Sequence, residues 1–214
     1  MHYNYLLQIM TDDTYLEILF KAGWILVPIL FMSVAEIYII IERWIVVAQY
    51  SKKNNTLTQV KKHLETGNIS AALQFCESQK NPSARMLAAG LRSIGQPIQD
   101  IEQAMETEAL RQTDELEHNM SYLGIISTVA PMLGFLGTIF GVIKIFYNIS
   151  LIDNISIGGI SSGLYQKMVS SAAGLWVGIV AYVGYQLLNG AISRITIRME
   201  RDGNELIGFL KTKK

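Results

Sequence analysis

Three long apolar stretches separate the polar parts of this chain. The first runs from Trp24 to about Ile41, the second from Tyr122 to Tyr147, and the third from Met168 to Leu188. As helices rising about 1.5 Å per residue, each covers roughly 27–38 Å, enough to cross a hydrocarbon core of about 30 Å. A buried core helix explains any one stretch, but the remaining polar residues are too few to bury all three. The pattern therefore predicts three transmembrane helices.

The polar part between the first two stretches reads as short helices. Helical spacing of apolar residues predicts one helix over 56–64, a second over 70–76 and a third between Pro82 and Gly95. From Asp100 a charged, weakly amphipathic pattern without Gly or Pro runs into the second stretch. A similar pattern follows the third stretch. Both of these spans are therefore expected to continue as long helices that pack against other helices outside the membrane.

Basic residues near the ends of the spans predict their orientation. The first twenty residues contain no Lys or Arg, and neither does the connection 148–162. Basic residues follow the first and third spans: Arg43, Lys52, Lys53, Lys61, Lys62, Arg194, Arg198, Arg201, Lys211, Lys213 and Lys214. The N-terminus is therefore expected outside and both larger polar segments in the cytoplasm. The first ten residues lack the basic region of a signal peptide, so the first span is expected in the mature protein.

Composition and charge exclude several functional classes. Half of the residues are hydrophobic and 17% are charged, against roughly 25% charged in soluble domains. Eighteen basic and eighteen acidic residues leave no net charge to attract nucleic acid. Cys76 is the only cysteine, so no disulfide scaffold or thiol–metal cluster is expected, and its thiol should stay free in the cytoplasm.

Groups that commonly perform catalysis are also missing. The histidines His2, His63 and His118 stand in polar surroundings, where a solvated surface position is expected. No strand leads into a glycine-rich loop, so no phosphate site is predicted. We therefore expect neither an enzyme nor a bound cofactor or metal.

Small and hydroxylated residues share one face in each of the last two spans. These residues are Ser127, Pro131, Gly134 and Thr138 in the second span, and Lys167, Ser171, Gly174, Gly178 and Ala181 in the third. Small residues four apart let helix backbones approach closely. Glycines expected to pack helices in this way are Gly134, Gly137, Gly141, Gly174 and Gly178. A membrane Ser or Thr can also bond the carbonyl one turn back, so each face predicts either a close helix contact or a narrow polar path. Pro131 should kink its helix and free a carbonyl on that face.

Neither face carries an Asp, Glu or His at membrane depth. Hydroxyl groups can pass a proton but cannot hold one as titrating sites near neutral pH. If the chain conducts protons, a carboxylate must therefore come from another chain. Lys144 and Lys167 are expected to reach towards the outer interface. Glu36 is the one acid well within a span. We expect it to pair with a basic group such as Arg43 near the cytoplasmic surface rather than to carry protons.

Two segments resemble signatures of the ExbB/TolQ/MotA family of ion-driven membrane motors, and of its ExbB/TolQ branch in particular. Residues 130–141 (APMLGFLGTIFG) are similar to the family's APLLGLLGTVxG signature, and residues 169–175 (VSSAAGL) resemble its TTAxGL signature. The first span resembles the family's GW…P…S…ER pattern at Gly23-Trp24, Pro28, Ser33 and Glu42-Arg43-Trp44. The three-span count also favours the ExbB/TolQ branch over four-span MotA-type members.

The chain differs from the family pattern at two positions. Gln166, followed by Lys167, stands where many relatives carry an acid before the third-span motif. Val180 replaces a proline that usually follows Gly-Ile. Without that acid, a proton route through a carboxylate of this subunit at the outer mouth is not expected.

The resemblance implies a homopentamer whose second and third spans line a central pore. It also implies an ExbD/TolR-like single-span partner that brings a membrane Asp, and a TonB- or TolA-like periplasmic protein that receives the work. Thr138 and Ser171 match the pore hydroxyls of the family. The proton pathway is expected to include Ser170, Ser127 and Pro131 as well, with Gln166 and Lys167 at the pore mouth. Protons are the ion expected from the branch.

The resulting architecture is an all-α integral protein of the bacterial inner membrane. Its expected segments are a periplasmic N-terminal segment (1–21), transmembrane helix 1 (22–44), a cytoplasmic helical segment (45–121), transmembrane helix 2 (122–147), a periplasmic loop (148–163), transmembrane helix 3 (164–188) and a cytoplasmic C-terminal helix (189–214). The residues do not separate an ExbB role from a TolQ role or from a specialised motor such as gliding. A passive membrane scaffold and a secondary transporter are the alternatives from other classes.

Overall fold

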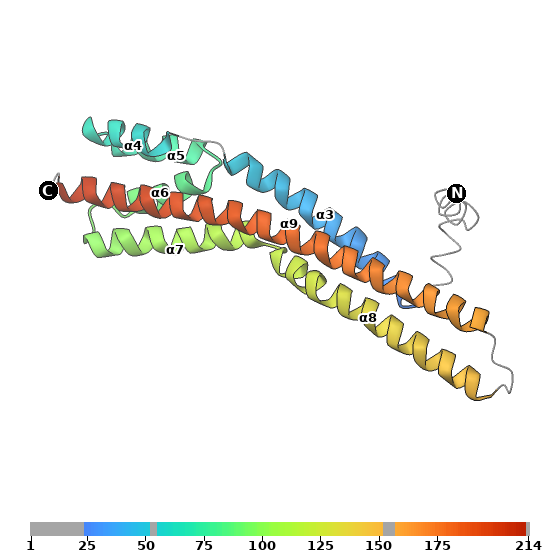
Figure 1. Ribbon diagram of the computed structural model, residues 1–214. Helices are drawn as coiled ribbons and strands as arrows, with labels where there is room; N and C mark the ends of the chain where they lie inside the picture. Colours follow the sequence, from blue (N-terminus) through green and yellow to red (C-terminus); the bar gives the residue numbers. More distant parts are fainter. Residues whose placement is uncertain (1–23, 52–54, 152–156, 213–214) are drawn as a thin grey trace. The chain divides into compact units, whose positions relative to one another are not determined.

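The computed structural model describes residues 24–51, 55–151 and 157–212 of the chain, without the side chains of residues 51, 157, 159, 162 and 166. Over these ranges the chain is helical (Figure 1). Its helices are α3 (Leu26–Ser51), α4 (Thr56–Glu65), α5 (Ile69–Ser78), α6 (Pro82–Arg92), α7 (Ile98–Glu117), α8 (Met120–Ser150) and α9 (Ile157–Thr212). The all-α class expected from the sequence is confirmed for this part of the chain.

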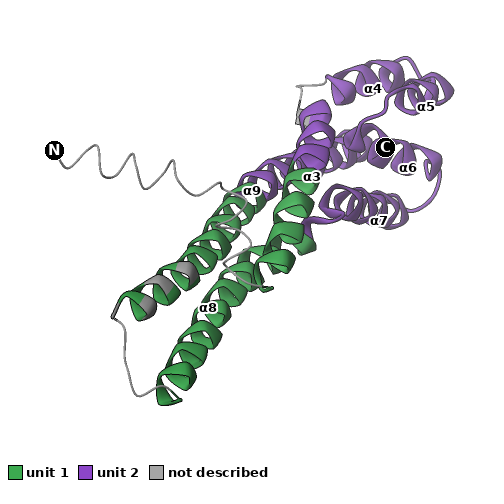
Figure 2. Ribbon diagram, turned by 90° about the vertical axis from the view of Figure 1, so that its right-hand side faces the viewer, with its two compact units in different colours: residues 1–40, 121–185 green, residues 41–120, 186–214 purple. Residues whose placement is uncertain are grey.

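The helices form two compact units, coloured separately in Figure 2. Unit 1 contains residues 121–185 and the described residues up to Ile40. Unit 2 contains residues 41–120 and 186–214. Both α3 and α9 contribute to each unit, whereas α4 to α7 belong to unit 2.

Unit 1 is a three-helix packing of α3, α8 and α9. Its core consists of Ile25, Ile29, Ile126, Ala130, Val177 and Ala181, with Met32, Ala35 and Leu133 packed against it. Many large apolar side chains of the same helices remain exposed, among them Phe31, Phe135, Phe140 and Trp176. An apolar surface of this kind suits lipid or other helices better than water.

Unit 2 has its own apolar core, built from α4 to α7 and the C-terminal part of α9. Buried members include Val60, Cys76, Leu87, Met199 and Leu206, each at most 1% exposed. Burial raises the pKa of the Cys76 thiol to about 11, so the thiol stays protonated and weakly nucleophilic. Cys76, the single cysteine of the sequence, is therefore a residue of the unit 2 core.

Local signals explain where the short helices of unit 2 begin. The Asn68 Oδ1 accepts the Ala71 N–H at 2.9 Å and caps α5. In the same way the Asn81 Oδ1 accepts the Ala84 N–H at 2.7 Å and caps α6, with Pro82 in its first turn. The three short helices predicted from the sequence are confirmed, with boundaries shifted by a few residues.

The expected uninterrupted helix from Asp100 into the second span is wrong. Helix α7 ends at Glu117 and α8 begins at Met120, because Asn119 adopts a left-handed backbone with φ of 65°. Asn tolerates this conformation better than most residues, yet it is not a strong helix breaker, so the sequence signal was weak. The continuation of the third span is confirmed, since α9 runs without a break for 56 residues.

Among the described residues, two helical segments are long and apolar enough to cross a membrane, Met120–Ser150 and Gly163–Thr212. Helix α3 has no charged residue before Glu36, but any eighteen consecutive residues within it include Glu36, Glu42 and Arg43. Length and composition therefore support two of the three expected spans directly.

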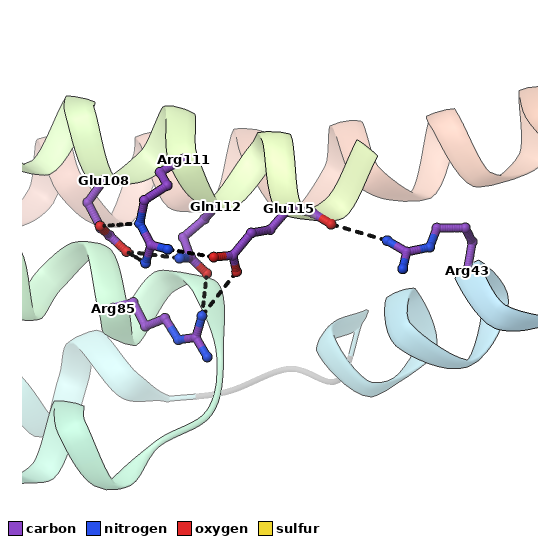
Figure 3. Close-up of polar contacts among 6 residues, drawn as sticks. All are labelled: Arg43, Arg85, Glu108, Arg111, Gln112 and Glu115. Atoms are coloured by element: carbon purple, nitrogen blue, oxygen red, sulfur yellow. Dashed lines mark hydrogen bonds and ion pairs between the residues drawn. The ribbon is translucent and has the colours of Figure 1, made fainter. Parts of the chain in front are cut away.

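A polar network joins α6 to α7 in unit 2 (Figure 3). The Arg111 guanidinium donates to both oxygens of Glu108, at 2.9 and 2.6 Å, and to Glu115 at 2.5 Å. Arg85 donates to Glu115 at 3.1 Å and to the buried Gln112 at 3.4 Å, and Gln112 donates to Glu108 at 2.9 Å. The network therefore gives the buried Gln112 amide both a donor and an acceptor.

The Glu108 carboxylate should make the stability of unit 2 depend on pH. Its hydrogen bond from Arg111 lowers the pKa of Glu108 in the folded state. The stabilisation is therefore complete above the ordinary carboxyl pKa of about 4.3 and is lost as the pH falls through the lowered value. We expect Glu108→Gln to cost about 0.5 kcal/mol near neutral pH, because solvent screens the pair. In thermal melts, the difference in melting temperature between this variant and the unchanged protein should become smaller as the pH is lowered. Glu106→Gln, on the exposed side of the same helix, is the control and should not change the acid dependence.

The left-handed position between α7 and α8 predicts a second effect. Asn119→Val should be less stable than Asn119→Gly by about 1–2 kcal/mol, because only the β-branched side chain clashes in this conformation. Both variants lose the Asn amide, so their difference isolates the backbone cost. Thermal unfolding of the purified protein measures it. Equal stability of the two variants would contradict the left-handed assignment.

Candidate functional site

In unit 1, α8 and α9 approach each other at glycines. A Cβ on Gly174 would lie 2.5 Å from the Ala130 carbonyl oxygen and 2.9 Å from the Gly134 Cα. A Cβ on Gly134 would lie 3.0–3.1 Å from backbone atoms of Ser170 and Ser171. Real side chains cannot occupy such positions without moving a backbone. The close approach of the two helices therefore depends on Gly134 and Gly174.

The other small residues line the same contact. The Gly137 position faces the Ser170 hydroxyl, at 2.9 Å from where a Cβ would stand. The Gly178 position meets the ring of Pro131 and the Ser127 carbonyl oxygen. The aliphatic chain of Lys167 covers Gly141. All five glycines singled out in the sequence thus lie against a neighbouring element of unit 1.

Two hydroxyl groups converge on one main-chain oxygen. The Thr138 Oγ1 donates to the Gly134 carbonyl at 3.3 Å and to the Lys167 carbonyl at 3.4 Å. The Ser170 Oγ donates to the same Lys167 carbonyl at 3.0 Å. Ser170 is fully buried, while Ser171 is only partly buried beside it. The structure therefore brings Thr138, Ser170 and Lys167 together at the α8–α9 contact.

The sequence did not identify the Lys167 carbonyl as the shared acceptor. Every residue has a carbonyl, so no residue type could have marked this one. The sequence placed Ser171 on the small-residue face of the third span, but it did not show that the Ser170 hydroxyl lies against Gly137 of α8. The rotation of α9 about its own axis places the Ser170 side chain against α8 and leaves the Ser171 side chain partly exposed.

The Ser127 hydroxyl bonds locally, and Pro131 frees a carbonyl nearby. The Ser127 Oγ donates to the Gly124 carbonyl at 2.8 Å, which is the local alternative that the sequence left open. Pro131 lies inside α8 and has no N–H, so the Ser127 carbonyl four residues earlier loses its helical donor. That oxygen lies against Gly178.

Of the two residues expected at the pore mouth, Gln166 and Lys167, the structure describes the side chain of Lys167 alone. The side chain of Gln166 lies outside the described part of the chain. Lys167 is half-buried with its chain along Gly141, and Lys144 is exposed.

Acidic groups are sparse in unit 1. From residue 121 to residue 185 the sequence contains a single acid, Asp153, which lies outside the described residues. Helices α8 and α9 therefore contribute hydroxyls and carbonyls, but no titrating carboxyl, to the described contact. No group of three or more His, Cys, Asp or Glu residues that could hold a metal ion occurs within the described ranges.

The pairing expected between Glu36 and Arg43 is wrong. Arg43 instead forms an ion pair with the adjacent Glu42 and donates to the Glu115 main-chain carbonyl at 3.1 Å, near the end of α7 (Figure 3). The separation explains this outcome, since seven residues along a helix correspond to about 10 Å. Glu36 is 2% exposed, and its Oε2 has no hydrogen-bond partner among the described residues.

Comparison with known proteins places these residues in a family context. The profile of the MotA/TolQ/ExbB proton channel family matches residues 78–201, more than half of the chain. This range contains the Thr138–Ser170–Lys167 contact and all five glycines, whereas α3 precedes it.

Individual relatives carry ExbB and TolQ names. A protein named ExbB-like 3 from Synechocystis is 28% identical over 160 residues, covering 73% of this chain and 76% of the relative. The biopolymer transport protein ExbB of Neisseria gonorrhoeae is 27% identical over 135 residues, covering 63% and 60%. The Tol-Pal system protein TolQ of Pseudomonas aeruginosa is 22% identical over 88 residues, covering 41% and 38%. The chain therefore spans less than two thirds of the length of two of these three relatives.

The helix contact predicts opposite effects of one substitution at two positions in α9. Gly174→Ala should destabilise the protein by about 1–3 kcal/mol, because its methyl group would overlap backbone atoms of α8. Gly190→Ala should be neutral or stabilise by up to about 1 kcal/mol, because a Cβ there meets nothing within 4 Å and Ala favours the helix. Thermal unfolding in detergent compares the two variants. A Gly174→Ala protein as stable as Gly190→Ala would rule out the close contact.

Proposed function

The chain belongs to the MotA/TolQ/ExbB proton channel family, and from this premise we propose that it is the proton-conducting subunit of an inner-membrane motor. The motor would convert proton-motive force into mechanical work on a TonB- or TolA-like periplasmic protein. This family is defined by proton conduction rather than by an enzymatic reaction. The observation that carries the proposal is that the Thr138 and Ser170 hydroxyls both donate to the Lys167 carbonyl, where α8 meets α9. Neither of these apolar helices has a carboxyl of its own at this depth.

The proposed topology has three spans. Helix α3 would form the first span, α8 the second and the N-terminal part of α9 the third. The absence of Lys and Arg from residues 1–20 and 148–162 supports an external N-terminus and an external second loop. Residues 45–121 and 189–214 would then lie in the cytoplasm.

The proposed assembly is a homopentamer with a single-span ExbD/TolR-like partner. The exposed apolar side chains of unit 1 support contacts with lipid and with further helices. Thr138 and Ser171 would face the central pore, with Ser170, Ser127 and Pro131 along the same path and Gln166 and Lys167 at its mouth. The partner would bring the membrane Asp that α8 and α9 lack.

Charge and hydrogen bonding supply the proposed mechanism. A proton that crosses at 100 mV releases about 2.3 kcal/mol from the potential alone. Protonation neutralises the partner Asp, which can then pass the apolar wall of the pore. After proton release, the Thr138 and Ser171 hydroxyls would donate to the ionised carboxylate and define its resting position. An odd ring around a partner pair is asymmetric, which favours rotation.

An ExbB-like role in outer-membrane transport is the form of the proposal that we favour, since the Synechocystis and Neisseria relatives carry ExbB names. A TolQ-like role in envelope integrity is the second candidate, and the Pseudomonas relative supports it. The periplasmic domain of the partner distinguishes the two.

The proposal predicts the effect of removing the two hydroxyls. The Thr138→Ala, Ser171→Ala double variant should still assemble but should lose proton-driven activity, because each hydrogen bond to a carboxylate contributes about 1.5–3 kcal/mol. That loss corresponds to about tenfold to a hundredfold per hydroxyl. Uncoupler-sensitive proton uptake in vesicles that contain the complete complex measures it.

Thr128→Ala is the matched control for this experiment. Thr128 also lies on α8, but it is exposed and its hydroxyl donates to the Gly124 carbonyl at 3.2 Å. Its variant should keep full activity. Full activity in the double variant would reject the assigned hydroxyls, and a phenotype that uncouplers leave unchanged would favour a passive scaffold.

A further inference from the structure

Glu36 is a buried acid in unit 1 that the proposed motor does not use. It lies in α3, is 2% exposed, and its Oε2 is buried with no hydrogen-bond partner in the described chain. A negative charge on this Oε2 would lack both water and a hydrogen-bond donor, so the buried position favours the neutral acid. The neutral acid carries a proton and avoids placing a charge in this packing.

The contacts of α3 define the surroundings of Glu36. The Gly137 position is approached by Ile25, which immediately precedes α3, and by Ser170 of α9, whereas Ile40 of α3 lies against Gly184 of α9. The fifteen-residue step from Ile25 to Ile40 thus corresponds to fourteen residues of α9, so α3 and α9 run in the same direction. Glu36, four residues before Ile40, therefore lies near the level of residue 180 of α9. Core residues at about this level of the packing are Val177 and Ala181 of α9 and Ile126 of α8.

No opposite charge faces Glu36 from the helices packed against it. Helix α8 has no Asp, Glu, His, Lys or Arg from Met120 to Ile143, and α9 has none from Met168 to Ser193. Titratable groups of these segments are the tyrosines Tyr122, Tyr182 and Tyr185. Lys144 and Lys167 lie beyond the Gly137 level, at the opposite end of the unit. On α3 itself, Tyr38 is exposed and Arg43 is engaged by Glu42.

We propose that Glu36 is a proton-binding site of this chain, with an exchangeable proton held by its carboxyl inside the α3–α8–α9 packing. The site is separate from the Thr138–Ser170–Lys167 contact and lies outside residues 78–201. The Glu36 site depends on the proposed function in one respect only, namely that unit 1 lies in the membrane. The chain would then supply one titrating group of its own in addition to the acid of a partner.

An apolar carbodiimide tests this site in the unmodified protein. Dicyclohexylcarbodiimide enters membranes and reacts with a protonated carboxyl. The acid proton moves to a carbodiimide nitrogen, the carboxyl oxygen bonds to the central carbon, and the adduct rearranges to an N-acylurea without a leaving group. We expect an adduct on Glu36 after labelling of membrane vesicles, located by peptide mass spectrometry. Labelling should fall at least about tenfold as the pH rises from about 6 to about 9, because the reactive form is the acid.

Three controls assign the result. Glu36→Gln, which keeps the neutral shape, should lose this adduct. A charged, water-soluble carbodiimide should label the exposed Glu106 and not Glu36. Labelling in sodium chloride should equal labelling in choline chloride.

Several outcomes would overturn the inference. They are the absence of an adduct on Glu36, labelling that does not change with pH, and protection by sodium, which would indicate a metal-cation site. Labelling does not require motor activity. An inactive complex that still labels at Glu36 would therefore refute the proposed motor alone, whereas an active complex without the adduct would refute this site alone.

Discussion

The close approach of α8 and α9 is the constraint on which unit 1 depends. At Gly134 and Gly174 the two backbones come so near that no side chain fits between them. This proximity lets the Thr138 hydroxyl of α8 reach the Lys167 carbonyl of α9, and it buries Ser170 in the same place. Hydrogen bonds between apolar helices are possible here because small residues removed the steric obstacle.

The three helices of unit 1 also carry different polar groups. Helices α8 and α9 present hydroxyl and carbonyl oxygens, which hold or relay hydrogen bonds without changing charge. Helix α3 carries the buried carboxyl of Glu36. Unit 2 concentrates its charges differently, in networks such as that of Arg111 with Glu108 and Glu115.

Much of this arrangement could be predicted from the sequence, because apolar periodicity and capping residues act locally. The helix starts after Asn68 and Asn81 follow from their own side chains. The break at Asn119 was missed because Asn is also compatible with a helix, and only the surrounding packing selects its left-handed backbone. The rotation that buries Ser170 rather than Ser171, and the partners of Arg43, depend on contacts between distant segments, which a linear pattern does not encode.

The glycine contact also means that the helices of unit 1 tolerate substitution to different degrees. Backbone atoms meet directly between α8 and α9, so a new side chain at these glycines has no compensating change within reach. By contrast, α3 meets α9 through a flexible aliphatic side chain, that of Ile40, which can be exchanged for another of similar volume. Substitutions should therefore be tolerated more readily on α3 than at the glycines where α8 and α9 meet.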